Sequence, residues 1–164
     1  MKSAKNGTRF LVLLATTIYG AAHASTFLCT PAESVIFSCS TERLNIIELC
    51  LDKRTRLISY RYGRPERIEL SYSGKQGGEN EFFFNHYFRS NVDYTRIGFV
   101  TAGYEYSVFR DYDGAEGSIP RYGVIVSENG NEVAQIKCQS QVIDNMSKII
   151  EQLRCDERSA LGCS

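Results

Sequence analysis

The stretch from Arg96 to Tyr112, which reads RIGFVTAGYEYSVFRDY, constrains the fold more than any other part of this chain. Two runs rich in β-branched and aromatic residues flank the short connection Thr101-Ala102-Gly103. Such runs favour strands, and glycine is the residue that best tolerates the positive φ of a tight turn. The pattern predicts a β-hairpin with a three-residue connection, in which Gly103 takes the left-handed conformation.

Similar runs recur on both sides of this hairpin and are separated by polar turns. Arg67 to Ser73 alternates strictly, so that Ile68, Leu70 and Tyr72 share one face of a strand. Asn129-Gly130 is the strongest short-range signal for a hairpin turn. Besides the two arms of the opening hairpin, the expected strands are Val35–Ser40, Ile46–Leu51, Leu57–Tyr62, Arg67–Ser73, Glu81–Phe88, Tyr122–Ser127 and Glu132–Cys138.

The periodicity changes after Cys138. Apolar residues then recur at three- and four-residue spacing, which predicts an amphipathic helix over about residues 141–155; they are Val142, Met146, Ile149, Ile150 and Leu153. An all-β chain must also protect the edges of its sheet, by closing a barrel or stacking two layers. We therefore predict an all-β fold with one C-terminal helix: an antiparallel meander of about eight strands, linked by disulfides, in a small barrel or sandwich.

The N-terminus has the pattern of an export signal. A basic region is followed by the apolar run Phe10–Tyr19, which is too short to span a bilayer. Ala22-His23-Ala24 then offers the small-x-small pattern that a signal peptidase recognises. We expect residues 1–24 to be removed and residues 25–164 to form a single β-barrel-like domain. The expected location is therefore the periplasm or the extracellular medium, with no membrane span after cleavage.

The net charge of the chain without its signal peptide makes some kinds of binding partner less suitable than others. Removal of three basic residues from 19 leaves 16 Lys and Arg against 19 Asp and Glu, a formal net charge of −3. Nucleic-acid binding depends on neutralising phosphates with basic side chains, so a mildly acidic domain is a poor candidate for it. A protein or a small neutral molecule fits this charge better, and another protein is the partner that we expect.

All six cysteines lie beyond the predicted signal peptide. An even number in an exported chain favours disulfides, and the spacing lacks the Cys-x-x-Cys of a zinc site. We predict a first bridge across the hairpin, a second that closes a strand–helix unit, and a third that joins the two ends of the domain. The predicted pairs are Cys39–Cys50, Cys138–Cys155 and Cys29–Cys163, in that order.

The residue types of an active site do not form a recognisable pattern. His86 lies in the aromatic run FFFNHYF and fits a structural strand residue better than a catalytic base. Glu48, Glu69 and Glu105 lie on expected strands, where ion pairs with neighbours such as Arg61 explain them more simply than paired catalytic carboxylates. We therefore predict a protein that is not an enzyme, with no catalytic residue, no cofactor and no metal.

The polar loop from Asp111 to Arg121 is the predicted partner-contact site. Its acidic residues lack the ligand spacing of an EF-hand. Tyrosine and arginine, however, are the residue types enriched in protein interfaces. The candidate contact residues are Asp111, Tyr112, Asp113, Glu116, Arg121 and Tyr122. The alternative is that they are ordinary loop residues.

A series of short motifs between Val35 and Cys138 resembles a family of small, largely uncharacterised exported proteins of Gram-negative bacteria. The motifs are Phe37-Ser38-Cys39, Glu48-Leu49-Cys50, Leu57 to Gly63 (LISYRYG), Ile68 to Tyr72 (IELSY), Gly103 to Val108, Gly123 to Val126, and the closing Cys138. More distantly, a disulfide-linked β-barrel of this kind is similar to periplasmic lysozyme inhibitors and to effector-immunity proteins. The resemblance implies a protein-binding module, an inhibitor or immunity protein, that acts on a cell-envelope-targeting hydrolase.

Two other functions are compatible with the same sequence. A small envelope enzyme or ligand carrier would use the interior of the barrel, and it requires a polar, roomy cavity with convergent carboxylates or His86. A structural envelope protein is the other alternative. A solid aromatic core would argue against the enzyme and the carrier.

Overall fold

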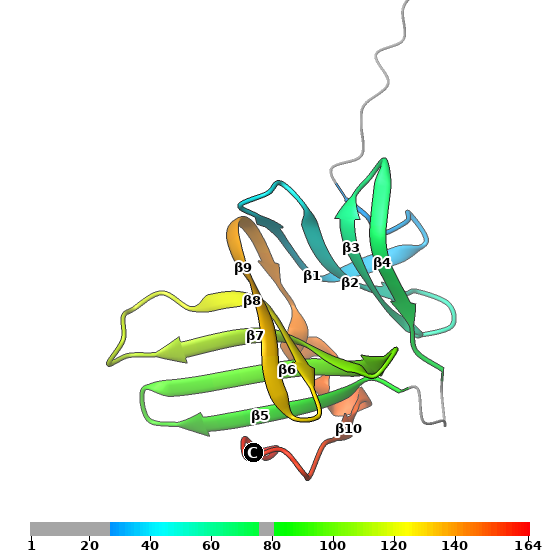
Figure 1. The fold of residues 1–164 in the computed structure, drawn as a ribbon. Helices are drawn as coiled ribbons and strands as arrows, with labels where there is room; N and C mark the ends of the chain where they lie inside the picture. Colours follow the sequence, from blue (N-terminus) through cyan, green and yellow to red (C-terminus); the bar gives the residue numbers. More distant parts are fainter. Residues whose placement is uncertain (1–26, 76–80) are drawn as a thin grey trace, which may run out of the picture.

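The computed structural model describes residues 27–75 and 81–164, so the predicted signal peptide lies outside the described residues. Ten strands form a single curled sheet in the order β10-β5-β6-β7-β8-β9-β1-β2-β3-β4 (Figure 1). The strands are β1 (Glu33–Thr41), β2 (Ile46–Asp52), β3 (Ile58–Arg64), β4 (Arg67–Ser73), β5 (Phe83–Arg89), β6 (Val92–Thr101), β7 (Tyr104–Asp113), β8 (Arg121–Glu128), β9 (Asn131–Asp144) and β10 (Arg154–Cys155). The predicted all-β, disulfide-linked fold is confirmed, but the sheet has ten strands instead of about eight.

Strand β9 joins the two halves of the sheet. Its first part pairs with β8 as far as Lys137, and from Cys138 to Asp144 it pairs with β1. The β1–β9 ladder has register shifts at Ser40, and Gln141 has a φ of 55°. Bulges of this kind increase twist and bend a sheet. The change of partner along one strand therefore curls the sheet into a half-barrel, as Figure 1 shows.

Aromatic side chains fill the concave side of the curled sheet. The ring of Tyr72 on β4 stacks on Phe99 of β6, with centroids 4.3 Å apart, and Tyr60 of β3 lies 5.0 Å from the same ring. Phe82 and Tyr106 complete the cluster at 5.3 and 5.2 Å from Phe99. Strands β3 and β4 thus pack across β6 through aromatic contacts, which stabilise the curl.

The opening hairpin is confirmed, but its connection is one residue shorter than predicted. Thr101 pairs with Tyr104, so the turn consists of Ala102-Gly103, with φ angles of 50° and 83°. Asn129-Gly130 forms a second two-residue turn with nearly the same angles, 51° and 80°. Positive φ at both positions describes the type I′ turn, whose twist matches that of antiparallel strands.

The predicted C-terminal helix over about residues 141–155 is wrong. The β1–β9 ladder continues to Asp144, and the backbone N–H of Asn145 donates to the carbonyl of Ile36. These hydrogen bonds keep the backbone extended, so only two short 3₁₀ turns, η1 (Met146–Lys148) and η2 (Ile150–Gln152), fit before β10. No helix in residues 27–75 and 81–164 has the length and apolar character needed to cross a membrane.

The three predicted disulfide pairings are wrong. The bridges are Cys29–Cys50, Cys39–Cys138 and Cys155–Cys163. Cys39 and Cys50 lie on the same hairpin, but the register places Ile47 opposite Cys39 and Val35 opposite Cys50. The strand–helix unit that would have brought Cys138 to Cys155 does not form. Cys138 instead enters the β1–β9 ladder beside Cys39, and the chain ends near β5.

Candidate functional site

Asp113, the last residue of β7, shapes the loop at residues 114–120 that connects β7 to β8. Of the six predicted contact residues only Glu116 lies in this loop; the others lie on the strands beside it, Asp111, Tyr112 and Asp113 on β7 and Arg121 and Tyr122 on β8. The carboxylate of Asp113 accepts hydrogen bonds from the Ala115 N–H at 2.9 Å and the Tyr94 hydroxyl at 3.0 Å. Its backbone carbonyl accepts from the N–H groups of Glu116 and Gly117. The bond from Ala115, followed by that from Tyr94, lowers the pKa of Asp113. Asp113 therefore fixes the base of the loop.

Asp111 and Tyr122 also have structural partners. The carboxylate of Asp111 forms a two-pronged ion pair with Arg96, in which one of the two contacts measures 3.0 Å. The guanidinium of Arg96 lies over the ring of Phe109 at 5.2 Å. The Tyr122 ring lies 6.1 Å from the core residue Phe37, and burial raises the pKa of Tyr122. These two predicted contact residues stabilise the sheet.

The accessible part of the loop lies further along the chain. Glu116 and Arg121 form an ion pair of 2.8 Å with side chains that are 58% and 61% exposed. Ile119 is 82% exposed, and Pro120 follows it. We did not single out Ile119 from the sequence, although an isolated large apolar residue beside a proline in a polar loop is a recognisable signal. Among the six predicted residues, Glu116 and Arg121 are exposed, and Tyr112, opposite Asp93 in the β6–β7 ladder, is half-buried.

A groove of ≈ 600 Å³ lies beside this loop. Ile119, Pro120 and Val142 line it together with Lys137, and the buried ring of Phe109 borders it. The other lining residues are Asp111, Arg121, Tyr122, Gln135, Cys138 and Gln139. Val142 also lines a second hollow of ≈ 340 Å³, which extends towards Phe27 and Ile46. The exposed apolar residues Ile119, Val142 and Phe27 thus border adjoining hollows on the surface.

His86 belongs to a ladder of charged side chains across β5, β6 and β7. Its Nε2 lies 3.1 Å from a carboxylate oxygen of Asp93, and the other oxygen of Asp93 pairs with Arg110. Arg110 also lies 4.0 Å from a carboxylate oxygen of Asp144. These contacts link neighbouring strands and engage His86 as a structural residue.

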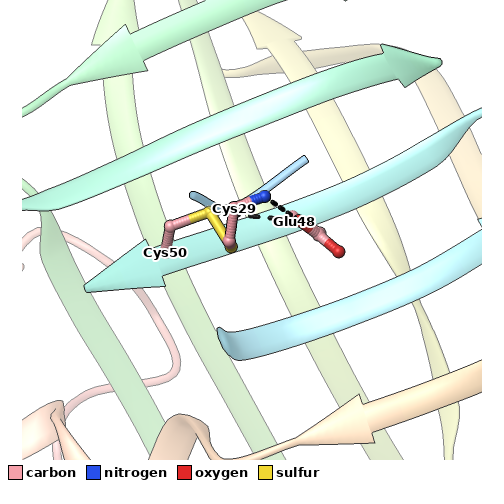
Figure 2. Close-up of side chains that lie close together, drawn as sticks. All are labelled: Cys29, Glu48 and Cys50. Carbon is pink, nitrogen blue, oxygen red and sulfur yellow. Dashed lines mark hydrogen bonds between the residues drawn. A yellow bond between two sulfur atoms is a disulfide. The ribbon is translucent and has the colours of Figure 1, made fainter. Parts of the chain in front are cut away.

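A second polar cluster lies beneath the segment that precedes β1 (Figure 2). Glu48 lies on the outward face of β2 and is 0% exposed. One of its carboxylate oxygens accepts the N–H groups of Leu28 and Cys29, each at 2.7 Å, and the other accepts the Ser38 hydroxyl at 3.0 Å. Burial raises the pKa of Glu48, although these hydrogen bonds oppose the change. The expected ion pair of Glu48 with a neighbour such as Arg61 is therefore replaced by hydrogen bonds from Leu28, Cys29 and Ser38.

Arg61 connects this cluster to Glu33. Its two terminal nitrogens donate to the two carboxylate oxygens of Glu33, at 2.7 and 2.9 Å. One of these nitrogens also lies 3.0 Å from Cys50 Sγ and 3.3 Å from the carbonyl of Leu28. Burial alone would raise the pKa of Glu33, but the hydrogen bonds from Arg61 and Thr30 hold it at about 2. Glu33 is therefore ionised and holds Arg61 in place.

The Cys29–Cys50 disulfide completes the cluster. Cys50 Sγ lies 4.0 Å from the Glu48 carboxylate, and the potential ligand atoms of Cys29, Glu48 and Cys50 lie within 4.8 Å of one another. A metal would bind the thiolate forms of these cysteines. The two sulfurs are bonded to each other here, as Figure 2 shows. The cluster is accordingly a disulfide with a buried carboxylate and a guanidinium beside it.

Comparison with known proteins finds no family model, no curated protein and no solved structure that matches this chain at a significant level. The function is therefore inferred from the geometry of the chain itself.

Proposed function

We propose that the protein is an exported, non-enzymatic protein-binding module, an inhibitor or immunity protein directed against a cell-envelope-targeting hydrolase. Its contact surface is the loop between β7 and β8. The observation that carries the proposal is Ile119, an apolar side chain that is 82% exposed on a loop whose base Asp113 holds in place. A loop that is already ordered loses little conformational entropy when it binds, so its apolar contacts contribute more fully to affinity.

The chemistry of the surface indicates how a partner would fit. Ile119 and Pro120 form an apolar tip that enters a cleft of the hydrolase, while the adjoining groove receives an apolar side chain of the partner between Val142 and Phe109. Lys137 lines the same groove and would face a carboxylate of the partner. The exposed Glu116–Arg121 pair contributes little to affinity, because solvent screens such pairs.

Three further observations support this choice of function. The aromatic cluster around Phe99 fills the concave side of the sheet, which argues for a partner on the outside instead of a ligand within. Three disulfides are typical of proteins in oxidising, extracytoplasmic compartments. The distant similarity of a disulfide-linked β-barrel of this kind to periplasmic lysozyme inhibitors and immunity proteins supports a hydrolase as the partner.

The proposal is tested with purified residues 25–164 and three purified enzymes: a lysozyme, a peptidoglycan amidase and a phospholipase. We expect the protein to inhibit at least one of them and to form a stable complex with it. The Ile119→Asp variant should inhibit that enzyme about tenfold less well, because the interface would bury an unpaired carboxylate. Val133→Asp is the matched control, since Val133 is also exposed, at 53%, but lies outside the groove.

Two results would contradict the proposal. One is that none of the three enzymes is inhibited and that cells producing the protein gain no protection from them. The other is that Ile119→Asp and Val133→Asp inhibit equally well, which would place the contact surface elsewhere.

A further inference from the structure

We propose that the Cys29–Cys50 bridge is a thiol–disulfide exchange site, at which an external dithiol attacks Cys29 and Arg61 stabilises the departing thiolate of Cys50. This reactivity is separate from the proposed contact surface of the β7–β8 loop. It assigns the protein a second kind of partner, a dithiol reductant of the cell envelope.

The two cysteines of the bridge differ in exposure. Cys50 lies on β2 and is 0% exposed, whereas Cys29 belongs to the segment that crosses the sheet and is only partly buried. Figure 2 shows the two residues on separate pieces of chain, with the bridge between them. Because an attacking thiolate must reach a sulfur atom, it reaches Cys29, and Cys50 becomes the leaving group.

Arg61 provides what a leaving thiolate needs. Its terminal nitrogen lies 3.0 Å from Cys50 Sγ, and its guanidinium is held there by Glu33. A neighbouring cation lowers the pKa of a thiol, and a leaving thiol with a lower pKa departs faster.

In the part of the chain that the structure describes, the other two bridges lack the cationic neighbour that the Cys29–Cys50 bridge has. Cys39–Cys138 also joins a buried cysteine, Cys39 at 1% exposed, to a half-buried one, Cys138, but Cys39 belongs to the hydrophobic core and has no described guanidinium beside its sulfur. In Cys155–Cys163, the donor to Cys163 Sγ is the neutral amide of Asn85, at 3.8 Å. Among the described residues, a cationic side chain donates to sulfur only at Cys50.

Glu48 can exchange a proton with the reduced Cys50. Its carboxylate oxygen lies 4.0 Å from Cys50 Sγ in a site that is closed to solvent. Burial raises the pKa of Glu48, so its protonated form is more populated than that of an ordinary glutamate. Three effects oppose formation of a thiolate at Cys50. They are the negative charge of an ionised Glu48, the burial of Cys50, and the partial neutralisation of Arg61 by Glu33. The proposal requires the 3.0 Å contact with Arg61 to outweigh these three effects.

The exchange proceeds in two balanced steps. A thiolate of the external dithiol attacks Cys29 Sγ, the bond between the two sulfurs breaks, and Cys50 Sγ departs with the electron pair. The second thiolate of the dithiol then attacks the first sulfur of the same dithiol, which is bonded to Cys29 in the mixed disulfide. Cys29 departs as a thiolate. The protein bridge gains two electrons and two protons, and the dithiol becomes a disulfide.

Hydrogen bonds keep the two cysteines close after reduction. The N–H groups of Leu28 and Cys29 donate to Glu48, and the N–H of Lys53 donates to the carbonyl of Ala32 at 3.1 Å. These contacts do not depend on the bridge. We therefore expect the fold to persist after exchange and the bridge to re-form on oxidation.

The first experiment treats purified residues 25–164 with reduced glutathione, used as a single-thiol probe, under native conditions. The reaction is quenched with N-ethylmaleimide, and the modified cysteines are located by peptide mass spectrometry. We expect glutathione on Cys29 and N-ethylmaleimide on Cys50. Glutathione on Cys50, or no opening of this bridge in the folded protein, would overturn the proposal.

The second experiment compares three arginine variants. Arg61→Met should slow the opening of the bridge about five- to tenfold, because the leaving thiolate loses its cation. Arg61→Lys should restore most of the rate, and Arg67→Met, at an exposed position on β4, should leave it unchanged. A purely structural role of Arg61 predicts the opposite result. Loss of its pair with Glu33 would loosen the segment and speed the opening, so an equal or faster rate in Arg61→Met overturns the proposal.

The third measurement is the pKa of the Cys50 thiol in the Cys29→Ser variant, followed by the ultraviolet absorbance of the thiolate. We expect a value below the ordinary cysteine pKa of about 8.5. A value at or above it would show that burial and Glu48 outweigh Arg61, and would overturn the assigned role of Arg61.

Discussion

Glu48 lies directly opposite Arg61 in the β2–β3 ladder, yet Arg61 donates both terminal nitrogens to Glu33. The carboxyl group of Glu48 instead accepts hydrogen bonds from the backbone N–H groups of Leu28 and Cys29. A cross-strand pair of opposite charges has therefore been separated by a segment that folds over the sheet. Unfolding of that segment would remove the Leu28 and Cys29 hydrogen bonds from Glu48.

Replacement of Glu48 by glutamine should lower the free energy of unfolding by about 2 kcal/mol, because an amide cannot accept all three of the hydrogen bonds that the carboxylate accepts without leaving a buried donor unpaired. Urea unfolding of the purified variant measures this change. Glu132→Gln on the exposed part of β9 is the control and should change stability by less than about 0.5 kcal/mol. Equal stabilities of the two variants would show that the Glu48 contacts contribute nothing.

The stability contributed by Glu33 should depend on pH. Its pKa is about 2 in the folded protein and 4.5 in the reference state, so its contribution is fully present above pH 4.5 and is lost as the pH falls towards 2. The difference in unfolding free energy between the wild type and Glu33→Gln should therefore shrink over this interval. Glu48 has the opposite sign, since its raised pKa favours folding at low pH. A difference that does not change between pH 4.5 and 2 would contradict the assigned ion pair with Arg61.

Ala102 should be a stabilising site for substitution. Its φ of 50° is nearly that of Asn129, at 51°, but alanine pays a steric cost in this region that asparagine largely avoids. Ala102→Asn should raise the free energy of unfolding by about 0.5–1 kcal/mol, and Asn129→Ala should lower it by a similar amount. Thermal unfolding of the two variants checks both signs. The prediction requires the unfolding temperatures of the two variants to shift in opposite directions. Shifts of the same sign would show that the two turns are not equivalent.

The three disulfides should differ in their contribution to stability. The Cys39–Cys138 bridge spans 99 residues and the Cys155–Cys163 bridge spans 8. Loop-closure entropy makes loss of the longer bridge costlier, by about 2 kcal/mol. Denaturant unfolding of the two double alanine variants would measure the difference. A larger loss for the Cys155–Cys163 pair would mean that local contacts at the C-terminus outweigh chain entropy.

Gly123 should tolerate alanine less well than Gly98. A Cβ at Gly123 would lie 2.2 Å from the backbone oxygen of Ile136, whereas a Cβ at Gly98 would lie 2.4 Å from the ring of Phe83. A ring can rotate away, but a backbone carbonyl in a ladder cannot move without breaking hydrogen bonds. We expect a loss of about 3 kcal/mol for Gly123→Ala and about 1–2 kcal/mol for Gly98→Ala. Chemical denaturation measures the free energy of unfolding of the two variants. A larger loss for Gly98→Ala than for Gly123→Ala would contradict the close approach of β8 and β9.

The candidate contact loop could be located from the sequence, but the roles of its residues could not. Its polar residues between two strand patterns predicted a loop here, but β7 continues to Asp113 and β8 begins at Arg121, so the loop is shorter than predicted. The pairing of Asp111 with Arg96 depends on strand register, and the capping role of Asp113 depends on the turn that the chain makes after it. The exposure of Ile119 depends on the absence of covering chain, which neighbouring residues do not reveal.

The sequence by itself determined most of the strands and turns and the face of many strand residues, because alternation and turn preference depend on a few neighbouring residues. Ile68 is an exception, since it is 46% exposed although it was predicted to share a face with Leu70 and Tyr72. Leu70 and Tyr72 face the core as their alternation predicts, and Gly103 takes its positive φ. Tertiary structure alone decided the disulfide pairs, the loss of the C-terminal helix and the burial of Glu48. Each depends on which distant segment covers a face or extends a ladder: β1 holds Asp144 extended, and the segment around Cys29 closes over Glu48.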